Sequence, residues 1–389
     1  MNFEKFFCNL YTFLRKYDIM LDDVRKKENR MLHLTAAQAT LKQNGYDAAI
    51  VSSKLNQRYL SGFDFDDGLI LLTLENAYLL TDFRYEEAAR ESVSADWKVL
   101  TPKEGHLPCI ASLLEKDGCR TVATEDQSLS CAEFERYRKL LDAYTLSGGA
   151  SALFLELRLH KDEAELECIA RAQRITDAAF AHIIKWIKPE MSEIEVALEL
   201  EYFMRREGAE GLAFETIAVS GSNSSRPHGT PRHCRLEKGF LTMDYGARVD
   251  GYCSDMTRTV CLGRADADMK RLYNTVLRAQ TEALAAAAEG VSCRELDRIA
   301  RDIINGAGYE GCFGHSLGHG VGLFVHESPR LAPGAAAESV LERGHVVTFE
   351  PGIYLAGKYG CRIEDMVAIR NDGSVYDFTS SPKELIELF

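Results

Sequence analysis

The sequence predicts a protein of two domains, an α/β domain followed by a larger α+β domain. The chain has 389 residues, which is long for one domain and enough for two. Strand and helix patterns alternate in the first part of the chain, and after about residue 155 long helices are interleaved with paired strands. We therefore expect an N-terminal extension (1–27), an α/β domain (28–154) and an α+β domain (155–389).

The composition is that of a globular protein, with 46% apolar and 27% charged residues. A formal net charge of −13 and the lack of a basic stripe argue against a nucleic-acid partner. The eleven cysteines include no C-x-x-C spacing, which argues against a disulfide framework and against a thiolate zinc site. We expect buried thiols in a reducing, cytoplasmic setting.

The extension has aromatic and aliphatic residues at helical spacing, which predicts an amphipathic helix that docks on the body or on a second copy in a homodimer. Charges at Glu4, Lys5 and Arg15 interrupt the apolar run, so neither a signal peptide nor a membrane partner is expected. A true start at Met20 or Met31 explains the extension equally well.

The α/β domain begins over residues 31–53 with a helix, a Gly-Tyr-Asp break and a strand. Residues 68–90 then predict two short strands joined by a turn and followed by a helix. A strand at 121–124 and a helix over 131–141 complete it. No reactive set of side chains is assembled in this part.

The α+β domain opens with a long helical pattern that Pro189 closes, and a second helix follows over about 192–207. Every candidate catalytic residue lies in this domain. The stretch "FGHSLGHGVGLFVHE" at 313–327 is rich in histidine and glycine, and two familiar motifs have to be tested against it.

Neither familiar motif suits its context. His315 and His319 have the i, i+4 spacing of a zinc-binding helix, but each of the neighbouring glycines would cost a helix about 1 kcal/mol relative to alanine. Ser316 lies in "GHSLG", which matches the G-x-S-x-G nucleophile elbow. That elbow joins a buried strand to a helix, and the flanking residues favour neither.

Two aspartates form a better candidate site. Residues 240–247 and 252–261 predict paired strands. If Asp250 and Gly251 form the loop, Asp244 faces Thr257 and Asp255 is its diagonal neighbour; a register centred one residue earlier places the two aspartates directly opposite. Both registers place the carboxylates on one face, where a divalent cation would relieve their repulsion. The alternative is that one aspartate only caps a turn and the other is solvated.

Two glutamates extend the set. Glu350 follows an apolar run, and Glu364 lies among aliphatic residues, so either is costly to ionise unless paired or bound to metal. An arginine partner would suffice for one such glutamate alone. A glycine-rich loop would let a histidine point inward from irregular backbone. Four carboxylates and one imidazole suit a two-metal site of Mn²⁺, Fe²⁺, Co²⁺ or Zn²⁺.

At this point the sequence closely resembles the pita-bread metallopeptidases, the family that includes methionine aminopeptidase, aminopeptidase P, prolidase and creatinase. The matching segments, in the family's order, are "SGSNSSRPHG", "LTMDYGARVDGYCSDMTRT", "FGHSLGHGVGLFVHE", "VVTFEPGIY" and "CRIED". The earlier "DFRYEEAA" resembles the smaller creatinase-type companion domain. The resemblance implies a pita-bread catalytic domain after that companion.

The resemblance also implies a ligand set. Asp244 would bind one metal ion, His319 and Glu350 would bind the other, and Asp255 and Glu364 would bridge the two. We expect Mn²⁺ first, with Co²⁺, Fe²⁺ and Zn²⁺ as alternatives.

Further roles follow for the pocket. Glu350 would also transfer the proton of the attacking water, and His228 and His326 would steady the substrate and the tetrahedral intermediate. For His228 and His315 the alternative is a neutral core histidine. The residues near the bound peptide would be His315, Tyr354 and Arg362, which line the proline pocket, and Phe214.

The two-domain layout points to the proline-specific branch of the family, and within it we favour an Xaa-Pro aminopeptidase, whose partner is a peptide with proline in second position. An Xaa-Pro dipeptidase shares the ligands and needs a cation for the product's carboxylate. A binding module without activity and an enzyme of the creatinase type are two further candidates. Phe324 departs from the acidic residue that many relatives carry, which concerns side-chain preference and not catalysis.

Overall fold

A computed structural model describes residues 31–389. The chain divides into two compact units, one that ends at Arg158 and one that runs from Leu159 to Phe389. The boundary expected after residue 154 falls inside helix α6 (Ala150–Leu159). The amphipathic helix predicted over 1–27 lies outside the described residues.

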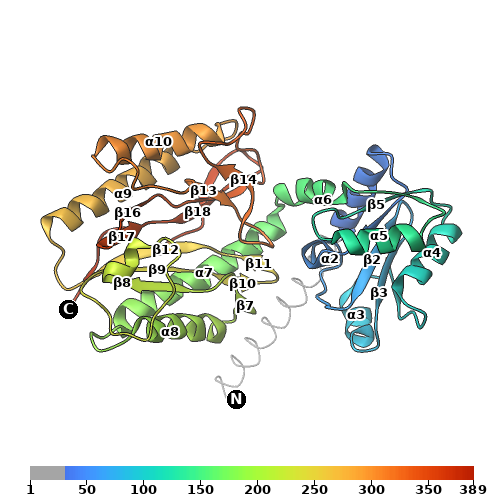
Figure 1. Ribbon diagram of the computed structural model, residues 1–389, viewed down its shortest axis with the longest axis horizontal. Coiled ribbons are helices and arrows are strands. Elements are labelled where there is room, and N and C mark those ends of the chain that lie inside the picture. Colours follow the sequence, from blue (N-terminus) through green and yellow to red (C-terminus); the bar gives the residue numbers. More distant parts are fainter. Residues whose placement is uncertain (1–30) are drawn as a thin grey trace, which may run out of the picture. The chain divides into compact units, whose positions relative to one another are not determined.

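The first unit is built on a mixed six-stranded sheet with strand order β4-β3-β2-β1-β5-β6, and Figure 1 shows helices flanking it. Its N-terminal helix covers residues 31–43 within the described part. The α/β class predicted for this part is confirmed. Its elements are β1 (Ala48–Val51), α2 (Lys54–Ser61), β2 (Gly68–Thr73), β3 (Ala77–Thr81), α3 (Glu86–Ser92), β4 (Trp97–Leu100), α4 (His106–Lys116), β5 (Thr121–Thr124), α5 (Cys131–Leu140), β6 (Thr145–Ser147) and α6.

The second unit places two pairs of helices on opposite sides of its strands (Figure 1). Capping boxes at Asp162 and Ser192 fix where α7 and α8 begin, because the cap and the third helical residue satisfy each other's free backbone N–H groups. The two helices pack on each other, as do the later two. The four helices are α7 (Glu163–Trp186), α8 (Glu193–Arg206), α9 (Ala267–Ala285) and α10 (Cys293–Gly306).

Two sheets carry most of the strands of this unit. One has the order β20-β12-β9-β8 and the other β14-β13-β15-β18-β19. A three-stranded sheet, β11-β10-β7, and the hairpin β16-β17 complete the unit. The strands are β7 (Gly211–Leu212), β8 (Ile217–Ser220), β9 (Gly239–Tyr245), β10 (Ala247–Val249), β11 (Tyr252–Cys253), β12 (Met256–Leu262), β13 (Gly318–Gly320), β14 (Glu327–Leu331), β15 (Val346–Phe349), β16 (Gly352–Leu355), β17 (Tyr359–Arg362), β18 (Asp365–Ile369), β19 (Val375–Asp377) and β20 (Glu387–Leu388).

Two apolar clusters fix these layers. Leu272 of α9 and Leu296 of α10 are fully buried in one cluster with Val347 of β15. Leu200 of α8 is fully buried in the other with Met243 of β9. Burial of large aliphatic side chains contributes about 1.5 to 3 kcal/mol each, so the clusters hold the sheets and their helices together.

The paired strands that carry the aspartates adopt the first of the two predicted registers. Asp244 lies opposite Thr257, and the turn is made by Asp250 and Gly251, both with positive φ. The register centred one residue earlier is therefore wrong. Each predicted strand is also split in two. The split occurs at Gly246, where a Cβ would lie 1.9 Å from the carbonyl oxygen of Ser254.

The glycine-rich stretch forms neither a zinc helix nor a nucleophile elbow. It follows helix α10 as a loop and then enters strand β13, which contains His319. A nucleophile elbow needs the reverse order, a strand that leads into a helix. Both motifs are therefore excluded by the backbone.

Within residues 31–389, the cysteines are all free thiols. No helix in that range has both the length and the apolar character that a membrane span requires.

Candidate active site

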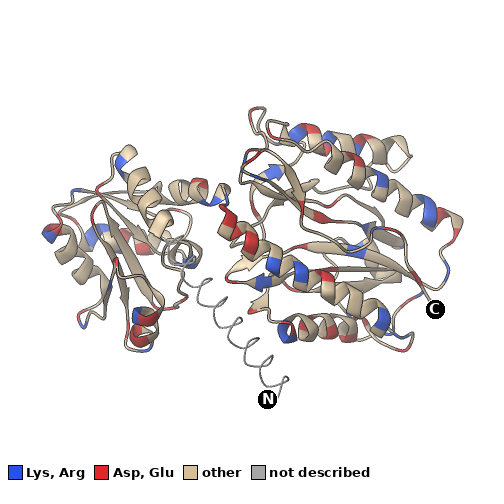
Figure 2. Cartoon of the chain, turned by 180° about the vertical axis from the view of Figure 1, so that it is seen from behind, with Lys and Arg blue, Asp and Glu red and all other residues tan. Residues whose placement is uncertain are grey.

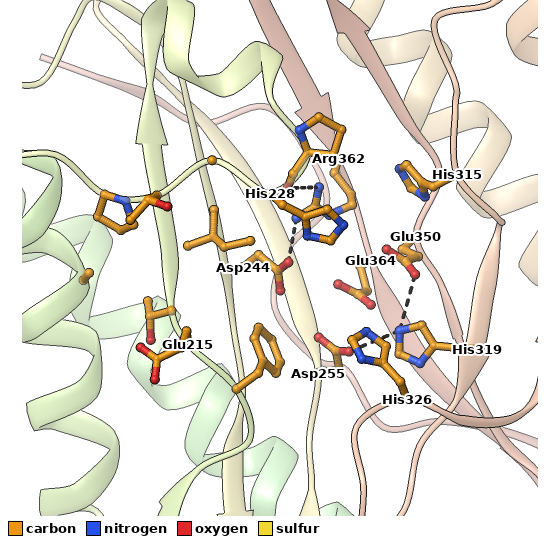
Figure 3. Close-up of a pocket in the computed structure, with 18 of the residues that line it drawn as sticks. Glu215, His228, Asp244, Asp255, His315, His319, His326, Glu350, Arg362 and Glu364 are labelled. Atoms are coloured by element: carbon orange, nitrogen blue, oxygen red, sulfur yellow. Dashed lines mark hydrogen bonds and ion pairs between the residues drawn. The ribbon is translucent and has the colours of Figure 1, made fainter.

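A cavity of about 590 Å³ lies in the second unit, and it gathers the predicted site residues (Figure 3). Tyr354 is not part of the cavity wall, but its hydroxyl lies 2.9 Å from His315 Nε2. The remaining predicted residues line the cavity: Phe214, His228, Asp244, Asp255, His315, His319, His326, Glu350, Arg362 and Glu364.

The five predicted metal ligands come from strands, or from strand ends, of both large sheets. Asp244 is on β9, Asp255 directly precedes β12, and His319 is on β13. Glu350 is the residue after β15, and Glu364 lies in the short break between β17 and β18. Glu350 thus follows an apolar strand, as expected, whereas Glu364, expected among the aliphatic residues of a strand, lies between two strands. Side chains within a strand must point alternately to its two faces, but residues at strand ends need not. Both glutamates can therefore point toward the aspartates.

The ligand atoms converge. Asp255, His319 and Glu364 each offer one ligand atom, and these atoms lie within 4.8 Å of one another in a fully buried setting. The Nε2 atom of His319 is 3.4 Å from a carboxylate oxygen of Glu350 and 3.6 Å from one of Asp255. Nitrogen and oxygen atoms at this spacing can share a divalent cation.

The imidazole of His319 is held in the tautomer that a metal requires. Its Nδ1 lies 3.0 Å from the carbonyl oxygen of Gly320, and since a carbonyl only accepts, Nδ1 carries the proton. The lone pair is then on Nε2, which faces the carboxylates. Burial lowers the pKa of His319 to about 3, so the ring stays neutral.

The carboxylates cannot all be ionised without added positive charge. Burial, followed by repulsion from neighbouring carboxylates, raises the pKa of Asp255 and of Glu364 well above the ordinary range. Burial also raises the pKa of Glu350 to about 8, although Arg362 opposes this. In addition, Asp244 Oδ1 is buried and has no hydrogen-bond partner among the described residues.

Two divalent cations fit this donor set. The four carboxylates and Arg362 together carry three net negative charges when ionised, which one divalent cation would not balance. Two would balance them and leave an excess of one positive charge. That excess would favour an anionic reactant or product in the cavity.

Arg362 connects two of the predicted metal ligands, Asp244 and Glu364, through hydrogen bonds. Its guanidinium donates to Asp244 Oδ2 at 2.6 Å, to the Thr257 hydroxyl at 2.9 Å and to the Tyr354 hydroxyl at 2.8 Å. The Thr257 hydroxyl in turn donates to Glu364 Oε2 at 2.7 Å. The buried guanidinium of Arg362 therefore orients two carboxylates, that of Asp244 directly and that of Glu364 through the Thr257 hydroxyl.

His315 presents a neutral ring to the cavity. Its Nδ1 donates to the Ser316 carbonyl, so its Nε2 accepts from the Tyr354 hydroxyl. Burial and the nearby Arg362 lower the pKa of His315 to about 4. With both nitrogens engaged, the ring acts as a flat wall and suits an apolar group such as a proline ring.

His228 and His326 lie at the exposed rim of the cavity. Figure 3 draws both imidazoles together with the carboxylates of the cavity. The rings of His326 and His319 are 4.4 Å apart in an edge-on arrangement. Burial, followed by repulsion from Arg330, lowers the pKa of His326, so it is a neutral hydrogen-bonding group near neutral pH.

Two residues of the site were not anticipated from the sequence. Thr257 joins Arg362 to Glu364, and its position opposite Asp244 was available from the register. Arg330, on β14, is exposed and lines the cavity. Arg330 is four residues after His326, and more exposed residues alternate with buried ones between them, which is the signal that could have found it.

Comparisons with known proteins identify the family of each unit. Residues 167–371 match a family described as Metallopeptidase family M24, and residues 33–160 match the Creatinase/Prolidase N-terminal domain. A relative named Xaa-Pro dipeptidase, from Pyrococcus horikoshii, is 38% identical over 347 residues, which cover 88% of this chain and 95% of the relative.

Solved structures give the same picture. The structure of an Xaa-Pro dipeptidase from Bacillus anthracis has a TM-score of 0.87 and 36% identity, covering 92% of this chain and 100% of that one. The structure of an X-Pro aminopeptidase from Thermotoga maritima has a TM-score of 0.83 and 35% identity, covering 90% and 99%.

Proposed function

Because the chain belongs to metallopeptidase family M24, we propose that it is an Xaa-Pro dipeptidase, which hydrolyses the bond before the proline of a dipeptide. The expected fold, a pita-bread domain after a creatinase-type α/β domain, is confirmed, and the chain is a peptide hydrolase of a family that uses divalent metal ions. Dipeptide specificity and the metal are the proposed parts. We take Mn²⁺ as the first candidate metal because the donor set is rich in oxygen.

Arg330 carries the preference for dipeptides. A dipeptide places a free carboxylate on the proline Cα, next to the scissile nitrogen, whereas a longer peptide has a neutral amide there. A guanidinium on the cavity wall beside His326 is suited to bind such a carboxylate through two hydrogen bonds. The sequence alone favours the aminopeptidase, whereas the position of Arg330 on the cavity wall supports the dipeptidase.

The residues of this chain divide the work of hydrolysis. Two divalent cations held by the five ligands would lower the pKa of the attacking water and polarise the scissile carbonyl. Glu350 lies beside His319 at the cavity wall and would take the proton of the water and deliver it to the proline nitrogen. His228 and His326 would donate hydrogen bonds to the oxyanion from the rim.

An Xaa-Pro aminopeptidase is the second candidate. A volume of about 590 Å³ is within the range of pockets that hold drug-sized ligands. It therefore leaves room for residues beyond a dipeptide.

The test compares Ala-Pro, Ala-Pro-amide and Ala-Pro-Ala-Ala as substrates of the Mn²⁺-loaded protein. We expect Ala-Pro to be cleaved fastest. Arg330→Met should raise the KM for Ala-Pro by about 10- to 100-fold, since a hydrogen bond to a charged group is worth about 1.5 to 3 kcal/mol, and should leave Ala-Pro-amide unaffected. Arg298→Met, a change on the exposed face of α10, is the control.

The outcomes separate the candidates. Efficient cleavage of Ala-Pro-Ala-Ala by a protein that is indifferent to Arg330→Met would favour the aminopeptidase. A metal-loaded protein that cleaves none of the three peptides would favour a binding module.

A further inference from the structure

Glu193 is a fully buried carboxylate that the catalytic scheme does not use. It is the first residue of α8, its side chain is 0% exposed, and it does not line the cavity. An unpaired carboxylate in such a place would be costly, so its hydrogen-bond partners indicate what it does. Those partners all belong to one loop.

The loop is the segment 220–232, which runs from the end of β8 and carries His228 to the cavity rim. Glu193 Oε1 accepts from the backbone N–H of Ser220 at 2.8 Å and from its hydroxyl at 3.0 Å, where the loop begins. Where the loop ends, Arg232 donates to Glu193 from its backbone N–H, Nε and Nη2 at 2.9 to 3.0 Å. One carboxylate thus joins the two ends of the loop.

The same carboxylate acts on the middle of the loop through Asn223. The Nδ2 group of Asn223 donates to Glu193 Oε2 at 3.0 Å and to the carbonyl oxygen of Thr230 at 3.1 Å. Thr230 is two residues from His228, and Asn223 is itself 2% exposed. Glu193 therefore orients the amide that holds the backbone next to the histidine.

The helix adds backbone contacts at the same place. The free N–H groups of Glu193 and Ile194, in the first turn of α8, donate to the carbonyl oxygens of Cys234 and Arg232. Burial raises the pKa of Glu193, but the bonds from Arg232 and Ser220 outweigh this, and the net pKa lies below the ordinary value. The carboxylate is thus ionised and paired near neutral pH.

We propose that Glu193 and Arg232 are positioning residues, which hold the loop 220–232 so that His228 reaches the reacting groups in the cavity. The inference rests on the proposed function in one respect, namely that His228 acts on the peptide. The position of the loop itself does not depend on which peptide is cleaved.

The test is the variant Glu193→Gln, which keeps the shape of the side chain but sets an amide against the donors of Arg232. We expect kcat/KM for Ala-Pro to fall by about 10- to 100-fold, the range that misplacement of a catalytic group produces. The Mn²⁺ content should be unchanged, since no metal ligand is touched. Glu195→Gln is the matched control, because Glu195 lies in the same helical turn but caps only Ser192.

Two measurements separate positioning from a general structural effect. In a protein that already carries His228→Ala, Glu193→Gln should lower kcat/KM for Ala-Pro by less than about 2-fold further, because two changes that act through one group are not additive. Amide hydrogen exchange over 221–232 of the metal-free protein should be faster in Glu193→Gln than in Glu195→Gln. If Glu193→Gln does not fold, Arg232→Lys, which keeps the charge but loses the planar fork, should show the same two effects at smaller size.

Full additivity with His228→Ala, or unchanged exchange in the loop, would overturn the inference. The exchange measurement needs no substrate. A wild-type protein that cleaves no Xaa-Pro peptide, together with faster loop exchange in Glu193→Gln, would therefore refute the proposed function and support the positioning of the loop.

Discussion

Removal of the metal ions should make the stability of the catalytic unit fall as the pH rises. Without cations, burial holds protons on the carboxylates of the site, and it raises the pKa of Glu350 from 4.5 to about 8. Between these two values the folded protein holds a proton that the unfolded chain has released. The stabilisation is thus fully present below pH 4.5 and is lost as the pH rises through about 8.

The size of the effect follows from the same two values. At about 1.36 kcal/mol per pH unit, Glu350 alone should lower the free energy of unfolding by on the order of 5 kcal/mol across this window. Asp255 and Glu364 act in the same direction, because their pKa values are also raised. Metal binding needs deprotonated ligands, so the stability that Mn²⁺ adds should grow over the same range.

Urea unfolding monitored by tryptophan fluorescence can measure this. The chain has two tryptophans, one in each unit, so Trp97→Phe leaves Trp186 to report on the catalytic unit. Trp186 packs against the apolar cluster of α7 and α8. Midpoints would be recorded from pH 5 to pH 8 after dialysis against a chelator, and again with Mn²⁺. Glu350→Gln, which cannot titrate, is the control and should show a weaker dependence on pH.

A metal-free protein whose midpoint stays constant or rises from pH 5 to pH 8 would refute this account of the site. If Mn²⁺ raised the urea midpoint by the same amount at pH 5 and at pH 8, the account would also be refuted.

Three substitutions test other parts of the catalytic unit, two in the site and one outside it. Glu364→Ala should abolish activity and reduce bound metal while the circular dichroism spectrum stays that of the folded protein; wild-type turnover would discredit the ligand assignment. Arg362→Met should weaken Mn²⁺ binding by about 10- to 100-fold in calorimetric titration, because it removes the donor that orients Asp244, and an unchanged affinity would contradict that role. Lys161→Met removes one hydrogen-bonded ion-pair partner of Glu327, whose side chain is 2% exposed, and should lower the free energy of unfolding in urea by about 1.5 to 3 kcal/mol, the worth of a hydrogen bond to a charged group; a loss below about 0.5 kcal/mol would contradict a stabilising role for this pair.

The local features of this protein were readable from its sequence. The strand at Thr121–Thr124 and the helix that begins at Cys131 follow from residue pattern, and both are present. A turn at Asp250 and Gly251 was one of the two registers that the sequence allowed, and the structure has it, with positive φ at both residues. The metal ligands were proposed from the chemistry of isolated carboxylates in apolar surroundings and from the resemblance to a family.

Contacts between distant segments could not be read in this way. Arg330 joins the cavity wall only because β14 pairs with β13, and Glu193 matters only because α8 begins beside both ends of a loop that follows it. Sequence pattern reports which face of an element is apolar, but not which other element will cover that face. The sequence by itself therefore determined the kind of chemistry, through residue types and turns, whereas the tertiary structure decided which side chains support it, because those contacts depend on how separate strands and helices pack. Figure 2 shows charged residues of both signs on the helices of both units, whereas Asp244 lies on β9 and Asp255 directly before β12.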